Sequence, residues 1–174
     1  EVSSTYFNHV IFLFIGGFLV ALAMEKWNLH KRIALRLLML VGNKPSHILF
    51  GFMLATAFLS MWMSNTATTM MMIPIVLSVM HGLRDQNNSS KFQIGLLLGI
   101  AYSASIGGIA TLVGTPPNLS FTRIFSIIFP QAPEINFVSW LIFALPLSIF
   151  LFIIIYFWLL YLFQPKENWG NTSK

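Results

Sequence analysis

Two clusters of small polar residues interrupt apolar stretches of this chain. The first cluster, Ser-Asn-Thr-Ala-Thr-Thr at residues 64–69, divides the apolar residues 46–80. The second comprises Ser-Ala-Ser-Ile-Gly-Gly at residues 103–108 and Gly-Thr-Pro-Pro-Asn at residues 114–118. Lipid offers no hydrogen bonds to a freed backbone amide or hydroxyl, so we expect both clusters to face protein or a water-filled cavity. Paired helix breaks of this kind are typical of binding sites in membrane transporters.

The chemistry that these residues favour is the binding of sodium by neutral oxygen atoms. A half-helix that ends within the membrane exposes carbonyl oxygens, and carbonyls together with hydroxyls suit a hard cation. Ser60 and Ser64 are four residues apart, which places both hydroxyls on one helical face before the first break. We expect a sodium site made by Ser60, Ser64, Asn65 and the carbonyl of Gly114.

An anion is expected beside this sodium site. A half-helix that begins within the membrane exposes unpaired N–H groups and the positive end of the helix dipole, and both stabilise an anion. No lysine, arginine, aspartate or glutamate occurs in residues 45–83 or 92–122. A doubly charged anion would therefore depend on bound cations for charge compensation. The expected anion contacts are Asn65, Thr66, Thr115, Pro117 and Asn118.

The composition of the chain indicates an integral membrane protein. Hydrophobic residues make up 56% of the 174 residues and charged residues 9%, which excludes a water-soluble globule. The apolar runs are continuous, as in spanning helices, and lack the alternating polarity of β-barrel strands. We therefore predict an all-α membrane fold. Lysine and arginine lie at the ends of the apolar runs, where they orient a membrane protein, and no basic patch predicts nucleic-acid binding.

The apolar segments also predict the arrangement of the chain in the membrane. Residues 25–45 carry the densest positive cluster, which places them in the cytoplasm. Residues 46–80 are too long for one span and are followed by further basic residues, which predicts a re-entrant hairpin of two half-helices. The expected elements are a spanning helix (7–24), a cytoplasmic interfacial helix (25–45), the re-entrant hairpin (46–80), a spanning helix broken by glycine and proline (92–129), a last span (138–162) and a cytoplasmic tail (163–174).

Together, the two motifs resemble those of the divalent anion/sodium symporter family of dicarboxylate, citrate and sulfate carriers. The resemblance rests on Ser-Asn-Thr at residues 64–66 preceded by Ser60, and on Ser-Ile-Gly-Gly and Gly-Thr-Pro-Pro-Asn at residues 105–108 and 114–118. It implies sodium-coupled symport of a dicarboxylate such as succinate, malate or fumarate, or of a related divalent anion. The carrier would be a multi-pass protein of the cell inner membrane that acts as an elevator-type homodimer. It also implies two inverted repeats. The chain does not begin with Met and holds one hairpin, so we interpret it as a fragment covering most of the first repeat.

The same resemblance implies roles for individual residues. By this likeness Ser60, Ser64, Asn65 and Gly114 would hold a sodium ion, and Asn65 with Thr66 would contact a substrate carboxylate. The alternative function is a proton-coupled anion transporter or an anion or ion channel subunit, which predicts acids or histidines inside the spans. The sequence contains no motif of a nucleophile with its base and none of an enzymatic metal site, so we do not predict an enzyme.

Several of these residues also have plain structural interpretations. Serine and threonine in membrane helices commonly bond back to their own helix. Gly107 and Gly108 could serve helix packing alone, and the two prolines could serve only as a kink. Trp62 is expected either to line the cavity or to pack. Met70, Met71 and Met72 are expected to fill gaps in the core.

Overall fold

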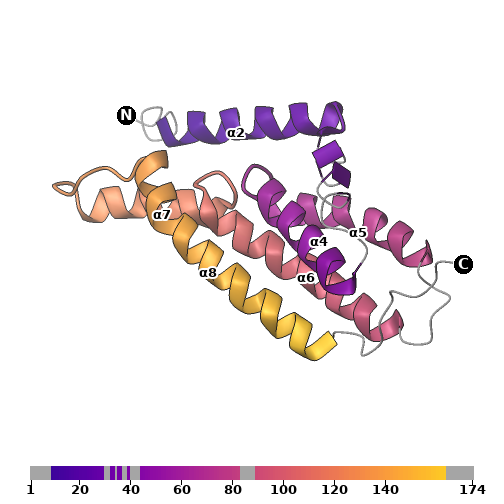
Figure 1. Cartoon of the computed structure of the whole chain (residues 1–174). Helices are drawn as coiled ribbons and strands as arrows, with labels where there is room; N and C mark the ends of the chain where they lie inside the picture. Colours follow the sequence, from indigo (N-terminus) through magenta and orange to yellow (C-terminus); the bar gives the residue numbers. More distant parts are fainter. Residues whose placement is uncertain are drawn as a thin grey trace, which may run out of the picture.

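Six helices are bounded in the part of the chain that the structure describes (Figure 1). The computed structural model describes residues 9–29, 32–33, 35–36, 39, 44–82 and 89–163. No strand occurs among these residues, which confirms the predicted all-α class. The helices are α2 (His9–Lys26), α4 (Pro45–Ser60), α5 (Asn65–Gly82), α6 (Ser89–Ala110), α7 (Pro116–Ile128) and α8 (Phe137–Phe163).

Two helices of the described chain are long and apolar enough to cross a membrane. They are Lys91–Ala110 within α6 and Phe137–Phe163, which is α8. Pro45–Ser60 and Asn65–Met80 are shorter apolar helices on either side of the first break. The helix predicted at residues 7–24 is α2, with bounds two residues later. The predicted interfacial helix (25–45) is described only in part, because residues 30, 31, 34, 37, 38 and 40–43 fall outside the described residues. The predicted tail (163–174) falls outside them except for its first residue.

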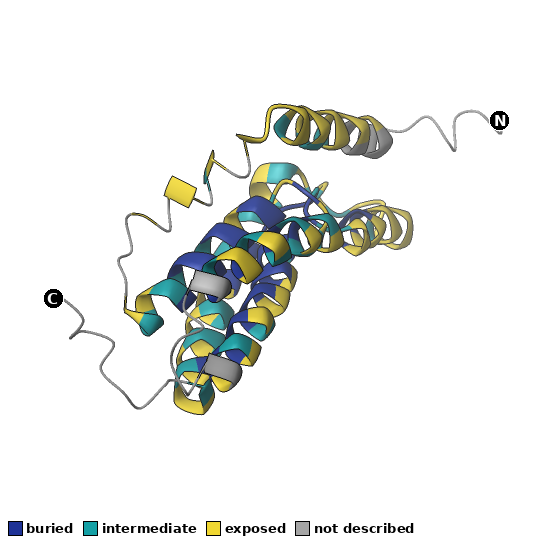
Figure 2. Ribbon diagram, turned by 90° about the vertical axis from the view of Figure 1, so that its right-hand side faces the viewer, coloured by how far each residue is buried: buried dark blue, intermediate teal, exposed yellow. Residues whose placement is uncertain are grey.

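The long helix α6 lies at the centre of the bundle and packs against α4, α5 and α8. Trp140 near the start of α8 donates from Nε1 to the carbonyl of Ile109, and Phe163 at its end lies against Gly95, so α6 and α8 are antiparallel. Figure 2 shows the buried residues along the faces where these helices meet. The core residues are Leu49, Phe52, Met53, Ala55 and Leu59 of α4, Met72, Val76 and Met80 of α5, Phe92, Leu96 and Ile100 of α6, and Leu159 of α8.

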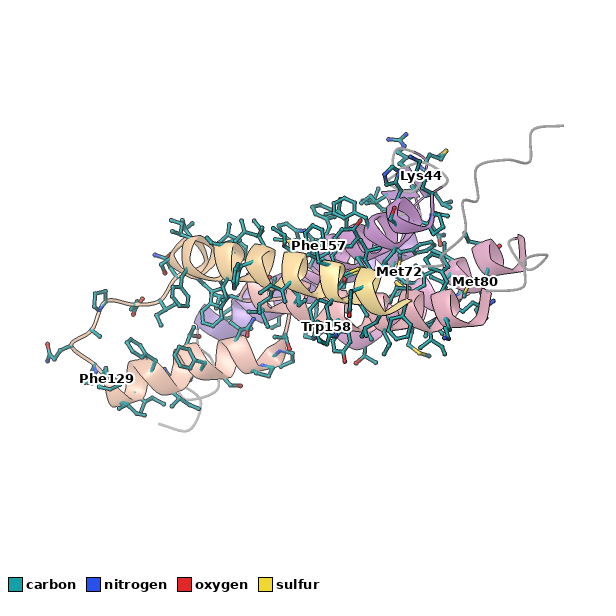
Figure 3. All side chains as sticks on the ribbon, turned by 60° about the horizontal axis from the view of Figure 1, so that its bottom comes forward. Lys44, Met72, Met80, Phe129, Phe157 and Trp158 are labelled. Atoms are coloured by element: carbon teal, nitrogen blue, oxygen red, sulfur yellow. The ribbon has the colours of Figure 1, made fainter. Side chains whose placement is uncertain are left out.

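The last helix, α8, presents apolar side chains on its outer face as well as toward the core. Figure 3 shows side chains projecting around it, and Phe157 and Trp158 are 62% and 59% exposed. On the inner side, Phe50 of α4 meets the rings of Phe152 and Tyr156 edge-on, with ring centroids 5.9 and 5.3 Å apart. A helix that is apolar all round suits a lipid environment.

The first helix, α2, lies across the end of the bundle that holds the two helix breaks (Figure 1). It ends in a turn in which Asn28 has a φ of 50°. Asparagine tolerates this left-handed conformation, which commonly terminates helices. The side of α2 that carries Gly17 faces the second break, where a Cβ on this glycine would stand 3.1 Å from the side chain of Val113.

Candidate functional site

The first helix break occupies residues 61–64, between the end of α4 at Ser60 and the start of α5 at Asn65. The sequence predicted the interruption at residues 64–69, so the break lies slightly earlier than expected. The reason is local. Residues 65–69 form the first turn of α5, and the polar side chains that appeared to disrupt a helix instead begin one.

Ser64 begins α5 as its N-terminal cap. Its hydroxyl accepts a hydrogen bond from the N–H of Ala67 at 3.3 Å, which satisfies a donor that the first helical turn leaves open. Farther along the same turn, the hydroxyl of Thr68 donates to the carbonyl of Ser64, and that of Thr69 donates to the carbonyl of Asn65. The structural interpretation therefore holds for Thr68 and Thr69, whose hydroxyls bond back to their own chain.

The second helix break occupies residues 111–115 and is held by Asn118. Its side-chain amide donates to the carbonyl of Gly108 at 2.9 Å and to the carbonyl of Thr111 at 2.7 Å. Both carbonyls lie where the end of α6 leaves acceptors without helical partners. Pro116 starts α7 at a position where a missing N–H costs nothing. The helix predicted at residues 92–129 is interrupted at glycine and proline, as expected, and α7 begins at Pro116.

The two breaks meet. The hydroxyl of Thr111 donates to the carbonyl of Met61 at 2.5 Å and accepts from the N–H of Gly114 at 3.0 Å. Gly114 also lies close to both broken helices, because a Cβ on it would stand 2.6 Å from the carbonyl oxygen of Gly108 and 2.9 Å from that of Ser60. A larger residue at position 114 would push the breaks apart.

Ser60 and Asn65 form a polar contact at the centre of this junction. The Ser60 hydroxyl is fully buried and lies 2.8 Å from Oδ1 of Asn65 and 2.7 Å from the carbonyl oxygen of Ala104 in α6. A hydroxyl has one hydrogen, so it can donate fully to only one of these two acceptors. The other close oxygen–oxygen contact becomes most favourable when a cation binds both oxygens, or when the Asn65 amide is turned so that its nitrogen faces the serine.

Gly107 and Gly108 are adjacent in α6 but serve different neighbours. A Cβ on Gly107 would overlap the backbone carbonyl of Ala57 in α4, which is a helix-packing contact. A Cβ on Gly108 would overlap Oδ1 of Asn65, which belongs to the junction of the breaks. The first glycine therefore has the packing role and the second permits the approach of a site side chain.

A small cavity of about 30 Å³ opens at this junction. Its volume suits a water-sized species. Trp62 lines it, as one of the two sequence interpretations expected. The lining residues are Gly17, Phe18 and Ala21 of α2, Trp62, Met63 and Ser64 of the first break, and Val113, Gly114 and Pro116 at the second.

The structure brings the four predicted sodium ligands together. Ser60 contacts Asn65 and lies against Gly114, while Ser64 and Gly114 line the same cavity. The predicted anion contacts lie at the starts of α5 and α7: Thr66 and Pro117 are exposed, Thr115 is half-buried and Asn118 is buried. Both amide hydrogens of Asn118 are already engaged, so its contact with an anion stays a prediction.

Sequence reasoning missed Thr111. It stands in the apolar run Ile-Ala-Thr-Leu-Val, where an isolated threonine commonly bonds to its own helix, and its partner Met61 is 50 residues away in the chain. The only local signal was its position three residues before Gly114. The buried hydroxyl of Ser148 also went unnoticed. Neither it nor the hydroxyl of Ser103, which belongs to the second polar cluster, has a hydrogen-bond partner among the described residues.

Comparison with known proteins gives a consistent result. The sequence model of a family described as citrate transporters matches residues 1–170. The chain is 44% identical over 169 residues to the sodium-dependent dicarboxylate transporter SdcS of Staphylococcus saprophyticus, an alignment that covers 93% of this chain and 32% of that protein. It is 46% identical over 168 residues to the protein of the same name from Staphylococcus aureus strain NCTC 8325, with coverages of 92% and 32%. The chain thus spans about a third of the length of these relatives.

Proposed function

Because this chain belongs to the citrate transporter family, we propose that its two helix breaks form part of the binding site of a sodium-coupled dicarboxylate symporter. Family membership supports a multi-pass carrier of the cell membrane over an enzyme, and it agrees with the resemblance to the divalent anion/sodium symporters. The relatives named as sodium-dependent dicarboxylate transporters support the choice of ion and substrate class.

The contact between Ser60 and Asn65 carries the proposal for the sodium site. A cation beside Oδ1 of Asn65 and Oγ of Ser60 would draw a lone pair from each oxygen, while the Ser60 hydrogen stays on the carbonyl of Ala104. Ser64 and the carbonyl of Gly114 complete an oxygen set that suits a hard cation. The described residues contain no cluster of three or more His, Cys, Asp or Glu that could bind a metal instead.

The anion would bind at the starts of α5 and α7. Asn65, Thr66, Thr115 and Pro117 lie at these two helix beginnings, where the positive end of the helix dipole favours negative charge. The first turn of α5 can add N–H donors, whereas the first two positions of α7 offer none because Pro116 and Pro117 lack an N–H. Neither break carries a charged side chain. The two charges of a dicarboxylate would therefore be offset largely by sodium. This arrangement couples the two ligands, because each binds more tightly when the other is present.

The arrangement of the helices supports a wider proposal about the complete carrier. We propose that α4 and α5 form the re-entrant hairpin and that α6 and α7 form a broken spanning helix. The chain would then be most of one inverted repeat of an elevator-type homodimer, with the remaining anion and sodium ligands supplied by the second repeat. The support is the pair of breaks and the coverage of about a third of each relative.

Uptake of labelled succinate into liposomes by the complete carrier tests this function. We expect uptake with a sodium gradient and almost none when potassium replaces sodium. Asn65→Ala should abolish uptake, since it removes an amide donor and a cation ligand at once. Asn136→Ala is the matched control, because Asn136 is an exposed asparagine before α8. Equal uptake in potassium, or near-normal uptake by Asn65→Ala, would contradict the proposal. Uptake driven by a proton gradient alone would favour the proton-coupled alternative.

A further inference from the structure

We infer that Thr111 is a positioning residue that joins the two helix breaks and thereby sets the sodium affinity of the site. This inference rests on the proposed function, because it concerns the same sodium site. Thr111 itself is not one of the proposed ligands. Its side chain is 1% exposed and contacts Met61, which follows the proposed ligand Ser60, and Gly114, which is itself a proposed ligand.

The hydroxyl of Thr111 uses both its donor and an acceptor position. Its hydrogen goes to the carbonyl of Met61 in the first break, at 2.5 Å, and its oxygen accepts the N–H of Gly114 in the second break, at 3.0 Å. One hydroxyl therefore connects segments that are 50 residues apart in the chain. Without it, a part-buried acceptor in one break and a buried donor in the other would lose their partners together.

Gly114 needs this anchor more than another residue would. Glycine has the widest backbone freedom, so a carbonyl at a glycine points in a fixed direction only when neighbouring contacts hold it. The N–H of Gly114 is held by Thr111, while its α-carbon side lies against the carbonyls of Ser60 and Gly108. These contacts fix the position of the Gly114 backbone, from which the proposed carbonyl ligand projects. The hydrogen bond from Thr111 to Met61 fixes the second break relative to the first break, which follows Ser60.

The test replaces Thr111 with valine in the complete carrier. Valine keeps the shape and the branched β-carbon but removes both hydrogen bonds. We expect the sodium concentration for half-maximal succinate uptake to rise about tenfold, as the loss of one to two net hydrogen bonds predicts. The KM for succinate at saturating sodium should stay within about twofold, because the anion contacts are untouched. Thr111→Ser should restore most of the sodium affinity.

Thr56→Val is the matched control. Thr56 is also a fully buried threonine, but its hydroxyl donates only within α4, to the carbonyl of Phe52 at 2.6 Å. This variant should leave the sodium titration unchanged. Thermal stability of the purified carrier, measured with and without sodium, gives a second readout. Thr111→Val should lose most of the stabilisation that sodium provides, whereas Thr56→Val should keep it.

Several outcomes would overturn the inference. One is an unchanged sodium titration in Thr111→Val, and another is a shift in Thr111→Ser as large as that in Thr111→Val. If Thr111→Val does not fold, Thr111→Ala removes the same hydroxyl without added bulk. Failure of both to fold while Thr56→Val folds would assign Thr111 to the fold and not to sodium affinity. The proposed function fails separately, when the unaltered carrier shows no sodium-dependent uptake.

Discussion

Gly108 lies directly against the side chain of Asn65, so that a Cβ on residue 108 would overlap Oδ1. Gly108→Ala should therefore displace this side chain, which ends in a flexible amide and can move at little cost to the fold. We expect sodium-dependent uptake to fall at least tenfold, because Oδ1 is a proposed sodium ligand, while thermal stability changes by less than about 1 kcal/mol. Uptake assays and thermal unfolding of the purified carrier measure the two effects.

The neighbouring glycine provides the contrast. Gly107→Ala would press on the backbone carbonyl of Ala57, which cannot move without shifting α4. It should lower stability by about 1–3 kcal/mol, the usual cost of overpacking. Gly16→Ala, where nothing lies within 4 Å of the added Cβ, should change neither property. Equal loss of stability in Gly107→Ala and Gly108→Ala would contradict the separate roles of these glycines.

Ser64 has two functions in the proposed site, and substitutions can separate them. Ser64→Ala removes the helix cap and the proposed sodium ligand, whereas Ser64→Gly removes the hydroxyl but starts a helix nearly as well. Both should raise the sodium concentration for half-maximal uptake by a similar factor. Ser64→Ala alone should cost about 1 kcal/mol of stability. Sodium titrations of uptake and unfolding curves distinguish the two functions.

A cap elsewhere in the chain is the control for Ser64. Asn136 caps α8, since its Oδ1 accepts the N–H of Ser139 at 2.8 Å, far along the chain from both breaks. Asn136→Ala should cost a similar amount of stability and leave the sodium titration unchanged. A normal sodium titration in both Ser64 variants would remove Ser64 from the sodium site.

The two breaks could be predicted from the sequence because the lipid environment makes polar clusters informative. A Ser-Asn-Thr cluster or a Gly-Thr-Pro-Pro-Asn cluster in an apolar run has few explanations other than a helix end. The exact position of the first break was less accessible. Serine is a good helix cap as well as a poor helix interior residue. A Ser-Asn-Thr sequence can therefore lie in the break itself or in the first helical turn after it.

The partners of individual residues could not be predicted, because they depend on tertiary contacts. Gly107 and Gly108 are neighbours in the chain, yet one faces α4 and the other faces Asn65. Adjacent helical positions differ by about 100° around the axis, and only the packing of α6 decides which neighbour each one meets. The role of Thr111 likewise depends on its tertiary contact with Met61, which the local sequence does not indicate.

Asn118 was predicted to contact the anion, whereas its observed hydrogen bonds hold the second helix break. Its amide hydrogens hold the carbonyls of Gly108 and Thr111, at 2.9 and 2.7 Å. Asn118→Ala leaves both buried acceptors without these donors, so we expect a loss of about 1–3 kcal/mol in thermal or denaturant unfolding. Asn118→Asp should cost at least as much, because a carboxylate of the same shape faces the two carbonyls with no hydrogen to donate. The KM for succinate at saturating sodium tests the predicted anion contact, and a change of less than twofold in Asn118→Ala would remove Asn118 from the anion contacts. A large rise in KM at unchanged stability would instead assign Asn118 to the anion.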